Sequence, residues 1–157
     1  MRPVVPSLLA LALIGAAPSQ PFTIAESGQG FAHLEDALMA VRGQDATVLI
    51  APGVYKECAI QQAGHITFKA TTPGSVVFDG ETCEGKAALV LRGEGSTVDG
   101  IVFRNMRVED GNGAGIRIEI GDLTVVNSMF LDSQEGILGG TDQPSRVRID
   151  RSTFAGL

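Results

Sequence analysis

One six-residue pattern occurs three times in the chain, as VDGIVF at residues 98–103, VVNSMF at residues 125–130 and IDRSTF at residues 149–154. Each copy begins with a β-branched apolar residue and ends with a Phe, and the three Phe residues are 27 and then 24 positions apart. A second short pattern alternates with the copies, as ALVL at residues 88–91, GIRI at 115–118 and GIL at 136–138. Self-similarity with a period in the twenties is typical of stacked units, and short β-type runs without helical periodicity predict a parallel β-helix.

The composition fits a single all-β domain with an aliphatic core. The 157 residues include 20 Gly and 7 Pro, as expected for a chain that turns every few residues, and 44% are hydrophobic although Trp is absent. The formal net charge of −6 argues against nucleic acid as a partner, because a phosphate-binding surface needs clustered Lys and Arg. The negative net charge also disfavours an acidic polysaccharide as a ligand, unless a divalent cation or a local arginine cluster makes the electrostatic potential at the site positive.

Residues 1–20 have the pattern of a secretory signal peptide. Arg2 supplies the positive start, residues 8–17 the short apolar run and residues 16–19 the small side chains near a cleavage site. The apolar run is too short to span a bilayer, so we expect no stable membrane span after signal removal. A buried N-terminal strand or helix is the alternative, which the surrounding prolines disfavour. We therefore expect residues 21–157 to be one domain of a secreted or periplasmic protein.

The spacing predicts one amphipathic helix near the start of this domain. Phe31, Leu34, Leu38 and Val41 recur at helical intervals, and Gly43 is a typical residue to follow a helix. Because the first unit of a stack exposes an apolar end, we expect this N-terminal helix to cover it as a cap.

The two cysteines, Cys58 and Cys83, are 25 positions apart, about one unit of the repeat. In an exported chain an even number of cysteines suggests a disulfide bond, and neighbouring strands lie about 4.8 Å apart, within the usual Cα separation for one. Two unpaired buried thiols are the alternative. A metal site is disfavoured because two cysteines without a nearby His rarely form one.

Three motifs follow the predicted helix: LIAPGVYKE at residues 49–57, ITF at 66–68 and VVFDG at 76–80. Together with the repeats they resemble the pectin lyase-like right-handed parallel β-helix superfamily, which includes polysaccharide lyases, pectin methylesterases, glycosidases and epimerases. The resemblance covers nearly all of residues 22–157. It implies a right-handed three-sheet parallel β-helix, a solenoid, with the helix as its N-terminal cap.

On this template each unit contributes one strand to each of three sheets. The first sheet is expected to contain residues 59–60, 89–91, 116–118 and 137–138. The second is expected to contain residues 48–50, 66–68, 98, 123–125 and 147–149. The third is expected to contain residues 76–78, 101–103, 129–130 and 153–154. The chain ends just after Phe154 without a capping segment, so we expect the domain to be incomplete at its C-terminus.

In the resembled polysaccharide enzymes the substrate cleft lies on the outer surface of the first sheet. Period-two alternation places Arg117 and Glu119 on that surface, where we expect them to be the catalytic residues. Arg92, on the neighbouring unit, and the loop residues Asn112 and Gln134 are the expected substrate-binding residues.

Acidic residues in the loops beside this sheet form a candidate metal site. Glu109, Asp110 and Glu135 are expected about one strand spacing apart and could hold Ca²⁺ through oxygen ligands. With Arg117 paired to a sugar carboxylate, the cation would lower the pKa of the adjacent carbon-bound proton, as β-elimination or epimerisation requires. Charged residues on exposed strands and turns are also what any soluble β-solenoid shows.

The leading hypothesis is an exported parallel β-helix that binds or modifies polysaccharide, as a lyase-like or epimerase-like enzyme on uronate sugars. The alternative is a non-catalytic structural or binding β-solenoid of the cell surface or periplasm, and a third possibility is a decayed or truncated relative that only folds. The resemblance implies no particular reaction, because function has to be argued from the site.

Overall fold

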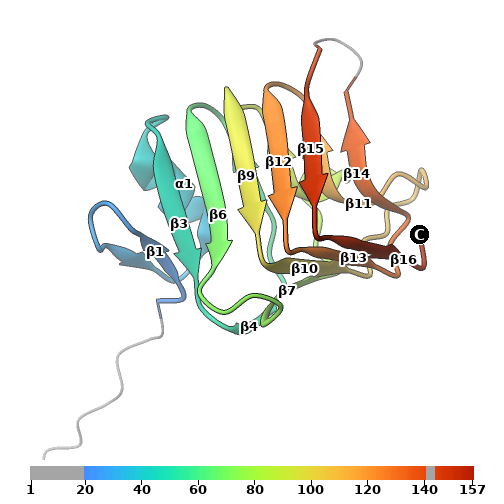
Figure 1. The fold of residues 1–157 in the computed structure, drawn as a ribbon, viewed down its shortest axis with the longest axis horizontal. Coiled ribbons are helices and arrows are strands. Elements are labelled where there is room, and N and C mark those ends of the chain that lie inside the picture. The colour runs from blue at the N-terminus through green and yellow to red at the C-terminus, as the bar shows by residue number, and fades with distance from the viewer. Residues whose placement is uncertain (1–19, 141–143) are drawn as a thin grey trace, which may run out of the picture.

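The computed structural model describes residues 20–140 and 144–157. These residues form an all-β-dominated structure with three mostly parallel sheets and one helix (Figure 1). The predicted signal peptide, apart from Gln20, lies outside the described residues.

The strands form sheets of seven, five and four strands, in which all pairings except those of β1 are parallel. The seven-stranded sheet contains, in spatial order, β2 (Gly30–Phe31), β1 (Phe22–Ile24), β3 (Ala46–Ile50), β6 (His65–Ala70), β9 (Gly95–Asp99), β12 (Asp122–Val126) and β15 (Val147–Asp150). The five-stranded sheet contains β4 (Gly53–Tyr55), β7 (Val76–Asp79), β10 (Ile101–Arg104), β13 (Met129–Leu131) and β16 (Thr153–Ala155). The four-stranded sheet contains β5 (Ala59–Gln61), β8 (Ala87–Leu91), β11 (Ala114–Ile118) and β14 (Glu135–Gly139).

From β3 onward the chain visits the three sheets in a fixed rotation, seven-stranded, five-stranded, then four-stranded. We call one such passage a circuit. The predicted division of the repeats among three sheets is confirmed, because every expected run pairs within its expected sheet. The sequence patterns do not predict β4, and its pairing with β7 extends the five-stranded sheet by one circuit.

A column of aromatic rings fixes the circuits relative to one another. The rings occupy one register position on successive strands of the five-stranded sheet and belong to Tyr55, Phe78, Phe103, Phe130 and Phe154. Their neighbouring centroids are 4.7 to 5.7 Å apart, and the three Phe–Phe pairs are stacked. Such pairs contribute about 0.5–1.5 kcal/mol each beyond their burial, so the column favours one register.

Three corners between the seven-stranded and five-stranded sheets, from β9 to β10, β12 to β13 and β15 to β16, each contain a left-handed residue. Gly100, Asn127 and Arg151 occupy these corners with φ of 76°, 53° and 45°. The Asn127 side chain donates to Asp99 Oδ1 at 2.9 Å and accepts from Arg151 Nε at 2.9 Å. A mixed ladder of side chains, from Asp99 through Asn127 to Arg151, therefore stabilises these corners.

The predicted helix is present but shorter than expected. α1 spans Leu34–Val41, and Phe31, which helical spacing had included, instead belongs to β2. The helix ends at Arg42, which adopts a left-handed φ of 55° and is followed by Gly43, also left-handed.

Two carboxylates tie α1 to the first circuit. The Leu34 N–H, which has no partner within the helix, donates to Glu57 Oε2 at 2.9 Å. In return Glu35 Oε2 accepts from the N–H of Ile60, in the edge strand β5, at 3.0 Å. The helix buries Leu34 and other apolar residues against this end of the structure, as a cap would.

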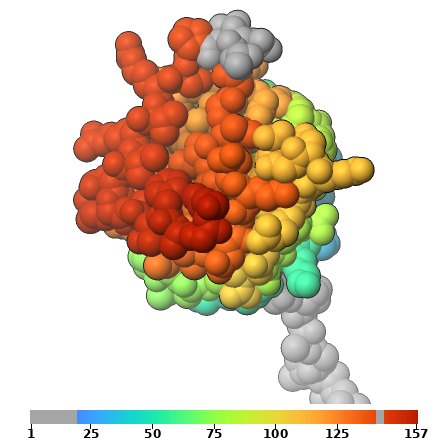
Figure 2. All heavy atoms as spheres, turned by 90° about the vertical axis from the view of Figure 1, so that its right-hand side faces the viewer, coloured from blue at the N-terminus to red at the C-terminus, as the bar shows by residue number. Residues whose placement is uncertain are grey.

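The last circuit lies at the opposite end, which faces the viewer in Figure 2. Its inward-facing side chains are not covered by any described strand, and four apolar residues there are 41 to 52% exposed: Val147, Ile149, Phe154 and Leu157.

Candidate functional site

The four-stranded sheet turns one face to the core and the other outward. One outward register column crosses the strands through Ile60, Val90, Arg117 and Leu138. Arg92 and Glu119 follow the ends of β8 and β11 and are hydrogen-bonded to each other. The two predicted catalytic residues and the predicted substrate-binding arginine therefore lie on one face.

This face is closed over β8. Ala87, Val90 and Ala114 form a buried apolar cluster separate from the core, and Val90 is 0% exposed although it points outward. We call residues 80–86, which connect β7 to β8, the strap. Cys83 of the strap packs on this cluster and forms an isolated antiparallel bridge with Ala87. The strap thus covers the outward side of β8.

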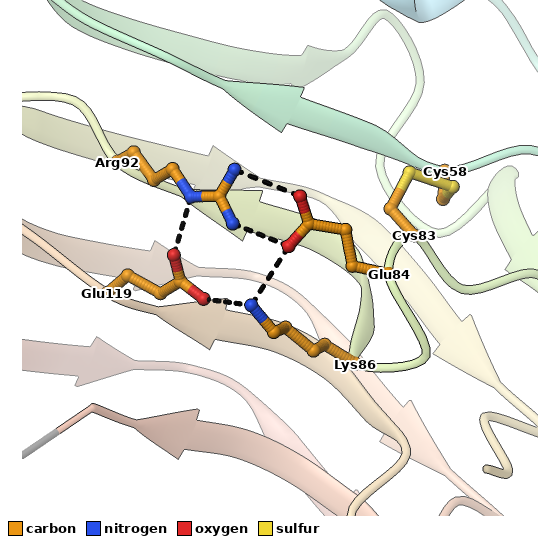
Figure 3. A network of polar contacts seen from close by, with 6 residues as sticks. All are labelled: Cys58, Cys83, Glu84, Lys86, Arg92 and Glu119. Carbon is orange, nitrogen blue, oxygen red and sulfur yellow. Dashed lines mark hydrogen bonds and ion pairs between the residues drawn. A yellow bond between two sulfur atoms is a disulfide. The ribbon is translucent and has the colours of Figure 1, made fainter.

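A ring of four charged side chains, Glu84, Lys86, Arg92 and Glu119, holds the strap in place (Figure 3). Arg92 donates to both oxygens of Glu84, at 3.1 and 2.5 Å, and its Nε donates to Glu119 Oε2 at 2.5 Å. Lys86 Nζ closes the ring, donating to Glu119 Oε1 at 2.6 Å and to Glu84 Oε2 at 2.9 Å. We call these residues the quartet.

The quartet keeps both carboxylates charged. Hydrogen bonds from Arg92 and then Lys86 lower the pKa of Glu119, and the same two donors lower the pKa of Glu84 to about 2. A general base works best with a pKa near the operating pH, and both oxygens of Glu119 are occupied. The catalytic role of Glu119 stays a prediction, and the geometry gives this residue a structural one.

The two cysteines form a disulfide bond. Their Cα atoms are 5.4 Å apart, and the bond joins the strap to the residue that precedes β5 (Figure 3). The alternative of two unpaired thiols is therefore wrong. The strap is anchored covalently at Cys83 and electrostatically at the adjacent Glu84.

The predicted substrate-binding loop residues have different surroundings. Gln134 Oε1 accepts from the N–H groups of Val108 and Gly113, both at 2.8 Å, and Gln134 Nε2 donates to the Val108 carbonyl at 3.1 Å. Gln134 therefore clamps the loop that precedes β11. Asn112 lies exposed in that loop, and its N–H donates to Asp110 Oδ1 at 3.1 Å.

The three predicted metal ligands do not assemble into a cation site. Glu109 and Asp110 are exposed in the clamped loop, whereas Glu135 begins β14 opposite Ala114. Within residues 20–140 and 144–157, no three His, Cys, Asp or Glu side chains are grouped so that they could hold a metal ion. Asp110 is instead used to turn its own loop.

Arg117 differs from the other two basic residues of this face. It is half-buried between Val90 and Leu138 in the outward column, and its Nε is buried without a hydrogen-bond partner. Lys86 and Arg92 are both paired, whereas Arg117 forms no ion pair with any residue that the structure describes.

Sequence reasoning missed Glu84 and Lys86. Both lie in the strap, where no strand periodicity indicates the direction of a side chain. The available signal was their position beside Cys83, because a disulfide to the neighbouring circuit brings the flanking residues onto the sheet.

Comparisons with family models, curated proteins and solved structures give no match to this chain. The class of protein is therefore defined by its architecture alone, an all-β chain that passes repeatedly through three mostly parallel sheets. Among the described residues, no helix has the length and apolar character needed to cross a membrane.

Proposed function

We propose that residues 21–157 form a right-handed parallel β-helix of the pectin lyase-like type, and that the protein is exported and binds an acidic polysaccharide. The rotation of the chain through three parallel sheets supports the fold. The Cys58–Cys83 disulfide supports export, because such bonds persist mainly in oxidising compartments.

One observation carries the binding proposal: Arg117 is a cation without an ion-pair partner among the described residues, set between apolar side chains. A guanidinium matches the fork of a carboxylate, and the apolar side chain of Leu138 beside it suits the C–H face of a sugar ring. A uronate offers both groups on one ring. The overall charge of −6 does not oppose such local recognition, because surface charges are screened beyond about 8–10 Å at physiological ionic strength.

The geometry favours binding over catalysis. Elimination or epimerisation needs a base that is free to accept a proton, and the predicted acidic candidate, Glu119, accepts hydrogen bonds from Arg92 and Lys86 on both oxygens. Displacing either donor would break the quartet that holds the strap. We therefore favour a non-catalytic binding module over a lyase-like or epimerase-like enzyme.

The test is affinity electrophoresis and calorimetry of the purified protein with polygalacturonate, alginate and a neutral glucan. We expect binding to a polyuronate and not to the glucan. Arg117→Ala should weaken binding about tenfold or more, because a charge-assisted hydrogen bond contributes about 1.5–3 kcal/mol. Arg148→Ala removes an exposed arginine from β15 of another sheet and should leave binding unchanged.

Absence of polyuronate binding, or equal binding by the Arg117→Ala protein, would contradict the proposal. The same samples, with and without Ca²⁺, should be followed for the ultraviolet absorbance of unsaturated uronate. Its appearance would show a lyase and overturn the non-catalytic assignment.

A further inference from the structure

A second candidate site lies at the other end of the four-stranded sheet, beside α1. A pocket of about 310 Å³ opens between the helix and β5. Its walls include Leu38 and Met39 of α1, Ile60 of β5 and the following Ala63, and Arg42 stands at the end of the helix. This volume is at the lower limit of small-molecule sites, which span about 300–1,000 Å³.

The apolar side chains of this pocket are not all needed for the core. α1 buries Leu34, Ala37 and Val41, whereas Met39 is 67% exposed. Ile60 points outward from β5 in the same column as Val90 and packs against the cluster beneath the strap, but it is only partly buried and lines the pocket. A ligand that covered Met39 and Ile60 would remove apolar surface from water, at about 25 cal/mol per Å².

Most polar groups around the pocket already have partners. Glu35 Oε2 accepts from the Ile60 N–H. Gln61, 2% exposed, donates to the carbonyls of Gly64 and Gly95 and accepts from Ser96, so its amide is fully used.

Two charged side chains line the pocket, at opposite ends of α1: Glu35 in the first turn, where it accepts from the Ile60 N–H, and Arg42 after the last turn. The one without a partner among the described residues is Arg42. It is exposed, and its guanidinium has no hydrogen bond or ion pair with any described residue. Its full positive charge exceeds the roughly half negative charge at a helix C-terminus, so the end of the rim at Arg42 favours an anion, whereas Glu35 lies at the other end of the helix. The pocket therefore combines apolar walls with a single unpaired cation.

We propose that this pocket binds a small amphiphile with an apolar body and a carboxylate head, such as a medium-chain fatty acid. The apolar chain lies against Leu38, Met39 and Ile60, and the carboxylate pairs with Arg42. This site is independent of the polysaccharide surface at Arg117.

The test is titration of the full chain with octanoate, octan-1-ol and octylamine, followed by calorimetry and by the methyl NMR signal of Met39, assigned with Met39→Leu. We expect saturable octanoate binding that shifts this signal. Arg42→Gln should weaken octanoate binding about tenfold or more and leave octanol unchanged. Ala63→Phe, a substitution at an exposed position, should fill the pocket and weaken binding of both. Arg148→Gln is the matched control at a distant exposed arginine.

Three outcomes would overturn the proposal. The first is a Met39 signal that octanoate leaves unchanged at millimolar concentration. The second is equal binding of the three ligands. The third is binding of octanoate by the Arg42→Gln and Ala63→Phe proteins as tight as by the unaltered chain. None of these results bears on polyuronate binding, which is measured separately.

Discussion

Opening the Cys58–Cys83 disulfide should destabilise the fold by an amount that its loop length sets. The bond closes a loop of 25 residues. With the chain-entropy relation, a crosslink of this length removes about 12 cal/mol/K from the unfolded chain, equivalent to about 3.5 kcal/mol at 25 °C. For a domain of this size that corresponds to a fall in Tm on the order of 10 °C.

The assay compares thermal unfolding of oxidised protein, protein reduced with a phosphine, and the double variant Cys58→Ala/Cys83→Ala. The reduced protein and the variant should agree, and the reductant should not change the Tm of the variant. Amide hydrogen exchange gives a local readout: residues 80–86 should lose protection first, because only the quartet, the apolar cluster and the bridge to Ala87 then hold the strap over Val90.

Equal Tm values for oxidised and reduced protein would refute this reasoning. They would mean that the strap is held fully by the quartet and the apolar cluster, or that the unfolded chain keeps residues 58 and 83 close without the bond. Loss of all structure on reduction would also contradict it, because 3.5 kcal/mol is smaller than the stability of a typical domain, about 5–15 kcal/mol.

Two further predictions concern the quartet and the aromatic column. Folding lowers the pKa of Glu84 from 4.5 to about 2, so the stabilisation from its ion pairs is complete above the pKa of the unfolded chain and disappears as the pH falls toward 2. The difference in urea midpoint between the unaltered protein and Glu84→Gln should therefore shrink as the pH falls through that range. A constant difference would argue against the ion pairs. Gly115→Ala places a Cβ 2.7 Å from the Phe130 ring and should lower the free energy of unfolding in urea by about 1–3 kcal/mol. In the control Gly139→Ala the new Cβ has no atom within 4 Å, so the loss should be far smaller. Equal losses in the two variants would contradict the packing argument.

The repeated Phe residues allowed most of the fold to be predicted. Phe103, Phe130 and Phe154 recur at the period of one circuit, and rings that stack at this spacing force equivalent strands into one sheet. Sheet membership followed because every other side chain is placed relative to this column by period-two alternation. Gly115 and Gly136 belong to the same pattern, because a Cβ at either position would contact a Phe ring of the column.

The parts that could not be predicted depend on contacts without a period. β4 is recognised only through its pairing with β7, since GVY at residues 53–55 is as suitable for a turn as for a strand. The helix begins at Leu34 and does not include Phe31, because Phe31 pairs with Phe22 in the seven-stranded sheet. In both cases a tertiary contact overrode the local preference.

The candidate site shows the same limit in its side chains. Period-two alternation correctly places Arg92, Glu119 and Val90 on the outward face. Alternation shows only the face of the sheet to which a side chain points, and not whether another segment covers that side chain. Val90 is outward and fully buried, because the disulfide holds the strap above it and the quartet closes over its edge. An outward position in a sheet of this kind is therefore a surface position only where no loop is fastened above it. The column is fully covered at Val90, whereas Ile60 beside α1 and Arg117 beside Leu138 are only partly buried. We therefore expect a ligand of this face to bind at one of these two positions.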